Sequence, residues 1–445
     1  MFKKKKIIKS TRVYLKEIDS RNTFHELLFN DNRYINPLKI IRIIKPFIPK
    51  RISPIARKLF LKAYQFLAQQ KSLPVSRSRK QFTFIKKYYV SERISPKNIS
   101  NLIQYPVSKA YVRPDINLYT IKDVFVVMGM SVLAYKNKYF YLEEDDLSIH
   151  VSPDEDLGIN LSAFLRPKKI EILSKCKEVL SYPMAMVISC RLASNYAHWV
   201  TDYLPRIILF YKDKKSLTVP LILSSSLHKN IIDSVYKYNP KILIHQVDNF
   251  CGIGIKKLYY VSPVSYVPYN FRSIKLSNQH KARIGFSHKF FKNFTRYYSV
   301  GDADRKFEKV YLLRKSNYRK ILNEDEVVKV LKELGFLIID PTSLSFSDQV
   351  LIFRGASIVV SAAGAALANI VFSNKKQIVV SILSDNPDHG FSFFPNLSYV
   401  SSACKIHFFF GTETRSSIHE DFSVNVNLLA DKIRALPNFS SSKTV

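Results

Sequence analysis

The chain has 445 residues, of which 47% are hydrophobic and 23% charged, and its formal net charge is +34. This length allows two or three domains with buried cores, and the composition excludes a wholly disordered protein. No apolar stretch is long enough to span a membrane, and no signal peptide is recognisable. Four scattered cysteines indicate neither a disulfide framework nor a zinc site, so we expect free thiols in a cytoplasmic protein.

The positive charge predicts an anionic partner, and much of it lies near the N-terminus. Residues 1–100 contain 25 Lys and Arg against five acidic residues. Segments 38–49 and 54–70 combine apolar residues with single cations, as expected for a segment on an anionic membrane surface or for a basic helical subdomain. Since no zinc-finger spacing or RNA-recognition signature accompanies the charge, we expect no nucleic-acid partner. We assign residues 1–120 as a basic N-terminal extension.

From residue 120 onward, apolar runs alternate with helical periods. A polar and basic region without clear periodicity, near residues 270–305, is expected to be a linker. Before it we expect strands at 125–128, 138–142, 184–189, 221–223, 242–246 and 257–261, and helices at 196–211 and 229–238.

A second alternating series follows the predicted linker. We expect Asn323 to cap a helix that stops at Gly335, and Ser345 to cap the next helix. Short strands between capped helices are typical of parallel βαβ units, so the sequence predicts an α/β protein with two Rossmann-like domains, 121–300 and 301–445, facing across a cleft. The expected strands are 310–314, 336–340, 357–361 and 377–382, and the helices are 324–334, 346–354 and one beginning at 365–371.

The first candidate site follows the strand at 184–189. On a helix, Asn195, His198 and Asp202 are separated by three and four residues and share one face. The helix begins at the carboxyl end of its strand, where open parallel sheets bind their ligands. A His and an Asp at that position can act as a general-base pair for a hydroxyl nucleophile. The alternative is a buried polar helix start that holds two elements together.

The second candidate site is the run of small residues at 361–369, directly after the strand at 357–361. Small side chains at Gly364, Ala365 and Ala366 allow a ligand to approach the backbone, and the first helical N–H groups favour a phosphate there. The same residues also suit tight packing of a helix on a sheet, which is the alternative.

The third candidate site lies at the end of the strand at 310–314. Arg314 and Arg319 can hold a diphosphate through paired, charge-assisted hydrogen bonds. A solvated basic turn explains the same residues equally well. Metal ligands are not indicated: the Asp-x-Asp at 302–304 falls in the predicted linker, and no His or Cys cluster has metal-ligand spacing.

Together these segments resemble glycosyltransferase family 61, which includes capsular polysaccharide biosynthesis proteins, over about residues 185–382. The family motifs are Asn-x-x-His-x-x-x-Asp running into Leu-Pro, a strand-ending Arg with a second Arg and an Asn-Glu helix start, and a Gln-bearing helix before Gly-Ala-x-Leu-x-Asn and Phe. Family members usually carry His before that Gly-Ala, where this chain has Ala363. The matching residues are Asn195, His198, Asp202, Leu204, Pro205, Arg314, Arg319, Asn323, Glu324, Gln349, Gly364, Ala365, Leu367, Asn369 and Phe372.

The resemblance implies a GT-B fold and an inverting, metal-independent transfer from a nucleotide-sugar, with no further cofactor. Under it, Asp202 or His198 is the base and Asn195 orients that base. Arg314 and Arg319 hold the donor phosphates, the backbone at 364–366 cradles them, and Asn369 shapes the donor pocket.

The implied acceptor is a surface polysaccharide or a lipid-linked glycan. A basic extension on the inner membrane face would suit a lipid-linked acceptor. Two other functions fit the sequence. A transferase of the same kind could add a non-sugar group, and a degenerate transferase could serve as a non-catalytic, membrane-associated scaffold of capsule assembly. Ala363 favours the scaffold, whereas the set of Asn195, His198 and Asp202 favours an enzyme.

Overall fold

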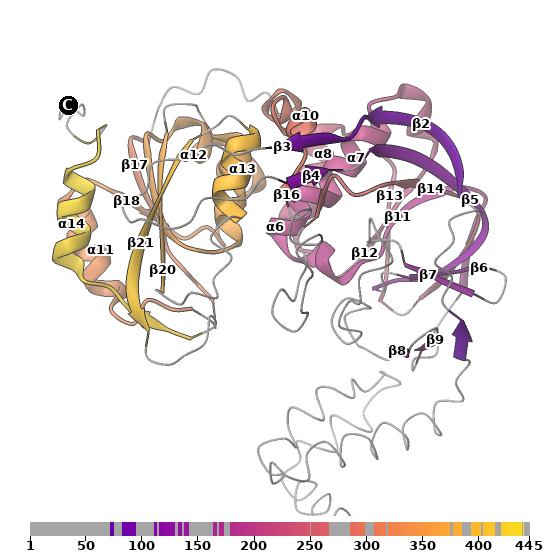
Figure 1. The fold of residues 1–445 in the computed structure, drawn as a ribbon, viewed down its shortest axis with the longest axis horizontal. Coiled ribbons are helices and arrows are strands. Elements are labelled where there is room, and N and C mark those ends of the chain that lie inside the picture. Colours follow the sequence, from indigo (N-terminus) through magenta and orange to yellow (C-terminus); the bar gives the residue numbers. More distant parts are fainter. Residues whose placement is uncertain are drawn as a thin grey trace, which may run out of the picture.

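The computed structural model describes residues 72–74, 82–94, 111–113, 115–129, 132–135, 138–141, 163–166, 169–172, 179–249, 251–266, 285–298, 307–316, 319–373, 377–384, 393–401, 404–413, 420–437 and 439. The basic segments at 38–49 and 54–70 and the Asp-x-Asp at 302–304 lie outside these residues, so what was predicted for them stays a prediction. The described strands form two large sheets and three small ones (Figure 1). No described helix is long and apolar enough to cross a membrane.

Among the described residues the first large sheet has nine strands, in the order β13-β12-β11-β14-β5-β6-β7, with β10 on β14 and β2 on β5. Its strands from β11 to β14 pair in parallel, and β5 is antiparallel to β14. Strand order therefore reverses between β11 and β14, which makes this a topological switch point. The strands are β2 (Thr83–Tyr89), β5 (Ile116–Val127), β6 (Val132–Tyr135), β7 (Lys138–Tyr141), β10 (Val179–Tyr182), β11 (Ala185–Ile188), β12 (Leu221–Ser224), β13 (Ile244–Val247) and β14 (Gly252–Val261).

The helix predicted at 196–211 forms, but its middle is a π-helical turn. It consists of α6 (Tyr196–His198), the π turn η3 (Trp199–Tyr203) and α7 (Leu204–Tyr211), and the next helix is α8 (Lys229–Tyr238). In the π turn the Leu204 N–H donates to the carbonyl of Trp199, five residues back. Pro205 follows at once and has no N–H to donate, so regular α-helical bonding is interrupted here. The turn changes which side chains share a face.

Among the described residues the second large sheet has six strands in the order β18-β17-β19-β20-β21-β22, all parallel except β22. Every residue of β19 and β20 is buried, as expected for strands covered on both faces. The chain passes from β17 to β18 on one side and then to β19 on the other, so a second switch point lies between β17 and β19. The strands are β17 (Lys309–Leu312), β18 (Leu337–Ile339), β19 (Ile358–Ala362), β20 (Ile378–Ser384), β21 (Lys405–Glu413) and β22 (Phe422–Ser423).

Helices cover both faces of the second sheet (Figure 1). Alternate strand residues supply the two cores: Val359 packs in the cluster that faces the first sheet, and Val360 packs in the cluster on the far side. The helices are α11 (Glu324–Glu333) and α14 (Val426–Arg434) on the far side, and α12 (Phe346–Gly355), the 3-10 helix η6 (Ala365–Phe372) and α13 (Phe393–Ser401) on the near side. The mixed α/β fold with parallel sheets agrees with the prediction.

Two of the three predicted helix signals are confirmed, and the third is confirmed in position but not in its side-chain contact. Ser345 and Asp348 form a reciprocal capping box at the start of α12. Gly335 has a φ of +80° and the Phe336 N–H donates to Leu331 O at 2.9 Å, which ends α11 in a left-handed turn. Asn323 occupies the N-cap position of α11, but its side chain makes no capping hydrogen bond. Its side chain instead exchanges two hydrogen bonds, of 2.8 and 2.9 Å, with the backbone of Val424.

The predicted linker is wrong for residues 285–298. This segment contains β16 (Gly285–Phe286), α10 (His288–Phe291) and the 3-10 helix η5 (Phe294–Tyr297). Phe286, Phe290, Phe291 and Phe294 are each at most 1% exposed. These aromatic side chains lie among Lys and Arg and follow no helical or strand period, because the chain turns several times within a few residues. The basic composition of residues 285–298 therefore gave no indication that the segment is buried.

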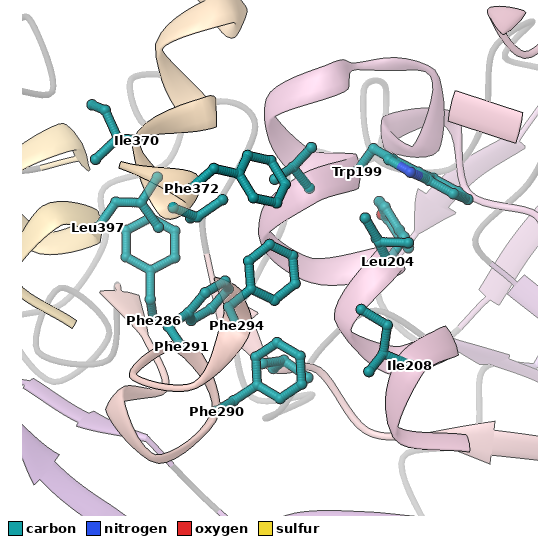
Figure 2. Packing of buried hydrophobic residues seen from close by; sticks show 14 of the residues in the cluster. Trp199, Leu204, Ile208, Phe286, Phe290, Phe291, Phe294, Ile370, Phe372 and Leu397 are labelled. Atoms are coloured by element: carbon teal, nitrogen blue, oxygen red, sulfur yellow. The ribbon is translucent and has the colours of Figure 1, made fainter. Parts of the chain in front are cut away.

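The aromatic segment 285–298 joins the cores of the two sheets. Phe294 stacks near Phe372 of η6, with ring centroids 5.3 Å apart, and Phe290 lies 6.0 Å from Tyr297. Trp199 and Ile208 of the first sheet's helices and Leu397 of α13 belong to the same buried cluster (Figure 2). One hydrophobic core thus runs from the first sheet to the second.

The three predicted domains stay a prediction. The predicted boundary at 120/121 falls inside β5.

Shorter elements complete the described chain. One small sheet has the order β1-β9-β8, and two others pair β3 with β4 and β15 with β16. Their strands are β1 (Ser72–Pro74), β3 (Glu92–Ile94), β4 (Tyr111–Arg113), β8 (Ala163–Arg166), β9 (Lys169–Ile172) and β15 (Ser265–Tyr266), and the short 3-10 helices are η2 (Arg191–Ser194) and η4 (Lys214–Thr218).

Candidate functional site

A cavity of about 370 Å³ lies at the carboxyl ends of β17, β18 and β19, and its wall includes residues from both sheets. The second sheet contributes the turns after these three strands and the start of η6. The first sheet contributes Ser194, Tyr196 and the first residues of α8. Because the strand order reverses between β17 and β19, the chain diverges at this edge and leaves a space that side chains do not fill. The cavity therefore lies where open parallel sheets bind ligands.

The charge of the cavity wall suits an anion. Arg314 and Lys315 line it, and among the residues that the structure describes no Asp or Glu does so. Ala365 and Ala366 open η6 at the same wall, where the first N–H groups of a helix have no partner within the helix. Cationic side chains and free helix N–H groups together form the usual surroundings of a bound phosphate.

Arg314 is held against Gly364 by direct contact. Its Nη1 donates to the carbonyl of Ala363 at 2.8 Å, and its backbone N–H donates to Glu324 Oε1 at 3.1 Å. A Cβ placed on Gly364 would overlap this guanidinium nitrogen. Glycine is therefore needed here for the close approach of a side chain, and the two predicted sites at Arg314 and at Gly364 form one site.

Arg319 lies near Arg314 but does not line the cavity. Its φ of +57° is left-handed, a conformation that a residue with a side chain adopts at some cost. Burial, and to a lesser degree the positive charge of Arg319, lower the pKa of Arg314 to about 10. Within the described part of the chain, the buried Nε of Arg319 has no hydrogen-bond partner. Two guanidinium groups held close together and away from water favour a nearby negative charge.

Asp202 is buried and its carboxylate is fully used in folding contacts. It forms an ion pair with Arg206, one turn further along the helix. Its other oxygen accepts hydrogen bonds from the backbone N–H groups of Val264 and Ser265 at 2.8 and 3.2 Å. Asp202 does not line the cavity. The arrangement matches the structural alternative, a polar group that holds the helix to the loop after β14.

His198 and Asn195 lie at the start of the same helix, also outside the cavity wall. Burial lowers the pKa of His198 to about 4, an effect that the nearby Asp202 charge opposes. The imidazole is therefore neutral at pH 7. Asn195 is the N-cap of α6, and its Oδ1 accepts the Ala197 N–H at 3.0 Å. The π turn begins directly after His198 and contains Asp202, and the effect of the Asp202 charge on the pKa of His198 indicates that the two groups lie near each other.

Asn369 is completely buried beneath the cavity and links its two walls. Its Oδ1 accepts the hydroxyl of Tyr196 at 2.6 Å, and its Nδ2 donates to Gln349 Oε1 at 2.9 Å. Tyr196 and Gln349 both line the cavity. A second bond joins the walls, from Asn230 Nδ2 to the carbonyl of Leu344 at 2.8 Å. Asn369 thus fixes two lining residues without lining the cavity.

The sequence interpretation missed His228 and Asn230 as lining residues. Both lie at the junction of the predicted strand at 221–223 and the helix at 229–238, so a polar pair after a parallel strand was the available signal. Among the described residues, no group of three or more His, Cys, Asp or Glu is placed to hold a metal ion.

Comparison with known proteins places this site within a family. The family model described as Glycosyltransferase 61 matches residues 196–380. Residues 196–380 form a glycosyltransferase family 61 domain. The matched residues include α6, the strands β17 to β19 and all the residues that line the cavity except Ser194. No curated protein matches the chain.

Solved structures give a weaker likeness. The chain is similar to the dodecameric iron-containing heptosyltransferase TibC, solved in complex with ADP-D-β-D-heptose, at 13% identity and a TM-score of 0.21. The match covers 47% of this chain and 59% of the heptosyltransferase chain. A likeness at this level supports no argument about donor, acceptor or domain arrangement.

Proposed function

We propose that the chain is an inverting, metal-independent glycosyltransferase of GT-B type that moves a sugar from a nucleotide-sugar to a surface polysaccharide or glycolipid. The observation that carries this proposal is the cavity at the β17/β19 switch point, with Arg314 seated on Gly364 beside the start of η6. In this proposal the two sheets belong to two Rossmann-like domains, and the cavity is part of the cleft between them.

The donor diphosphate is proposed to lie between Arg314 and the first residues of η6. In an inverting transfer the acceptor oxygen attacks the anomeric carbon while the bond from that carbon to the phosphate oxygen breaks. The electron pair leaves with the nucleoside diphosphate, so negative charge grows on the phosphate in the transition state. Arg314 and the N–H groups of Ala365 and Ala366 would stabilise this charge, with Arg319 adding to the field.

His198 is the better of the two proposed bases. Asp202 already accepts from Arg206, Val264 and Ser265, so protonating it would weaken three contacts of the fold. His198 is neutral at pH 7 because burial lowers its pKa, so its imidazole can accept a proton from an attacking hydroxyl, but the same lowered pKa makes it a weaker base than a free imidazole. Asn195 fixes the first turn that carries His198 and thereby its direction. Asn369 shapes the donor pocket through Tyr196 and Gln349.

Calorimetric titration with uridine, guanosine, cytidine and thymidine diphosphates, with and without chelator, tests the donor site. We expect one nucleotide to bind saturably, chelator to leave its affinity unchanged, and Arg314→Ala or Arg319→Ala to weaken it at least tenfold. Arg434→Ala is the matched control, since Arg434 is exposed on α14 and pairs with Asp431 at 3.0 Å. Binding that chelator abolishes would contradict metal independence.

Membrane association is proposed for residues 1–80, which carry most of the basic segments. Deleting them should release the protein from vesicles that contain anionic lipid, because about 1 kcal/mol of attraction is lost for each Lys or Arg near the surface. Flotation at two salt concentrations measures this directly. Vesicle binding that persists after the deletion would remove the extension from the proposal.

A non-catalytic scaffold is the second candidate, and two observations favour it. Ala363 stands where family members carry His, and the carboxylate of Asp202 is occupied by folding contacts. The scaffold predicts that His198→Ala leaves the chain's function in capsule assembly intact and that no nucleoside diphosphate binds. Restoring His at position 363 is then the first variant to examine.

A further inference from the structure

His228 lines the cavity from the first sheet, whereas Arg314 lines it from the second. It follows β12 and is the N-cap of α8, so the strand end and the helix start hold its backbone in place. Its side chain is exposed and lines the cavity together with Asn230. Nothing in the family motifs or in the proposed mechanism uses this residue.

The capping contact determines which nitrogen of His228 carries the proton. Nδ1 accepts the backbone N–H of Asn230 at 3.2 Å, so Nδ1 holds a lone pair rather than a proton. A neutral imidazole has one proton, which must then lie on Nε2. The ring can therefore offer the cavity a hydrogen-bond donor and no acceptor.

The surroundings of this donor fit a negatively charged group. Arg314 and Lys315 of the second sheet line the same cavity, and no carboxylate is among its lining residues in the described part of the chain. The N-terminus of α8, a helix of 10 residues, adds a partial positive charge on the same side as His228. A cationic wall facing an N–H donor leaves between them a space that an oxyanion fills well.

We infer that His228 donates from Nε2 to the phosphates of the nucleoside diphosphate held by Arg314, so that both sheets contact the same anion. This inference rests on the proposed function. The bound anion then closes the space between the walls, and leaving-group charge is stabilised from two sides. His228 is a binding residue in this scheme, and the proton of the acceptor hydroxyl goes to His198.

Two substitutions separate this role from the capping role. Asn is a good N-cap whose Oδ1 takes the place of Nδ1, but it does not reach the position of Nε2. His228→Asn should therefore keep the thermal midpoint of the wild type and lose the phosphate contact. His228→Ala should lose both. His245→Asn is the control, because His245 is half-buried on β13, contacts Tyr182 OH at 3.2 Å and does not line the cavity.

The experiment is titration of the full chain and these variants with the nucleoside diphosphate that binds the wild type and with inorganic pyrophosphate. We expect His228→Asn to weaken both ligands about tenfold to a hundredfold, and His245→Asn to change neither. Equal affinity of wild type and His228→Asn would overturn the inference alone. Weaker nucleotide binding with unchanged pyrophosphate binding would also overturn it, since the contact would be to the nucleoside. No binding by the wild type would overturn the proposed function as well.

Discussion

Gly364 and Arg314 behave as a single unit at the residue scale. The guanidinium occupies the space that a Cβ at position 364 would need, and the carbonyl of Ala363 holds it there. Gly364→Ala should displace this side chain while leaving the backbone in place, because the end of an Arg side chain moves easily. We expect nucleoside diphosphate affinity to fall at least tenfold and the thermal midpoint to change little.

Gly355→Ala is the matched control for this prediction. A Cβ on Gly355 would meet no atom within 4 Å, and Gly355 is the last residue of α12. Calorimetry should find wild-type affinity in this variant. If Gly364→Ala also kept full affinity, the guanidinium would not be positioned by that contact, and the donor site would need a different description.

His198 should make stability depend on pH. Its pKa is lowered to about 4 in the folded chain, because burial disfavours the charged ring, and is near 6.5 when unfolded. Between these values the unfolded chain binds a proton that the folded chain does not. The free energy of unfolding should therefore fall as pH decreases from 6.5 to 4, by at most about 1.4 kcal/mol per pH unit.

Urea unfolding of the wild type and of His198→Gln at several pH values measures this contribution. The stability difference between the two proteins should shift in favour of the variant as pH falls through this window, and stay constant above pH 7. A difference that does not change with pH would mean that His198 protonates equally well in the folded chain. His198 would then be in contact with water, and its pKa would not be lowered by burial.

At the scale of elements, Asp202 joins a helix to the loop that follows β14. Asp202→Asn keeps the shape and one acceptor for the N–H groups of Val264 and Ser265, but it leaves the charge of Arg206 buried without its carboxylate. We expect a loss of about 3 kcal/mol in the free energy of unfolding, since breaking a buried ion pair is costly.

Asp431→Asn provides the comparison, because its partner Arg434 is exposed and such pairs contribute at most about 0.5 kcal/mol. Chemical denaturation of both variants gives the two values. Should Asp202→Asn be as stable as the wild type and yet lose transfer, the carboxylate would have a chemical role and the case for His198 as the base would weaken.

Helices and strands of the second half were predictable because their signals are local. Ser345 and Asp348 lie three residues apart and make the capping box that their spacing indicates, and Gly335 adopts the left-handed turn expected after a helix. Asn323 has the same local signature, but Val424, about a hundred residues later, takes its side chain. The residues around Asn323 do not indicate a contact with a residue so far away in the sequence.

The candidate site was predictable in part for a related reason. Arg314 and Gly364 each follow a strand, and parallel strands bring such residues to one edge. Asp202 follows its strand as well, yet its carboxylate bonds to Arg206 and to backbone N–H groups and does not line the cavity. His228 carried no motif, and only the placement of α8 across from β17 makes it part of the wall. Residues that follow neighbouring parallel strands of one sheet can be placed together from the sequence. A residue that the other sheet contributes to the same cavity cannot.

For the whole molecule, the shared hydrophobic core predicts cooperative unfolding. Trp199 of η3 and Phe372 of η6 belong to one buried cluster, and Phe294 packs against Phe372 (Figure 2). Differential scanning calorimetry of the full chain should show one transition across both sheets. Phe294→Ala should keep a single transition but lower its midpoint temperature. The free energy of unfolding should fall by about 3 kcal/mol. Two separated transitions would contradict a common core.

The aromatic segment 285–298 also limits how this chain can be recombined with its relatives. Phe286 packs on Phe393 of α13, and Tyr297 packs on Tyr238 of α8, so the segment belongs to both halves at once. A chimera that exchanges the second half at residue 300 would bring together aromatic surfaces shaped for different partners. Exchanging the second half between this chain and another protein with a family 61 domain therefore calls for crossover points outside this segment, with the facing residues of α8 or α13 transferred in the same step.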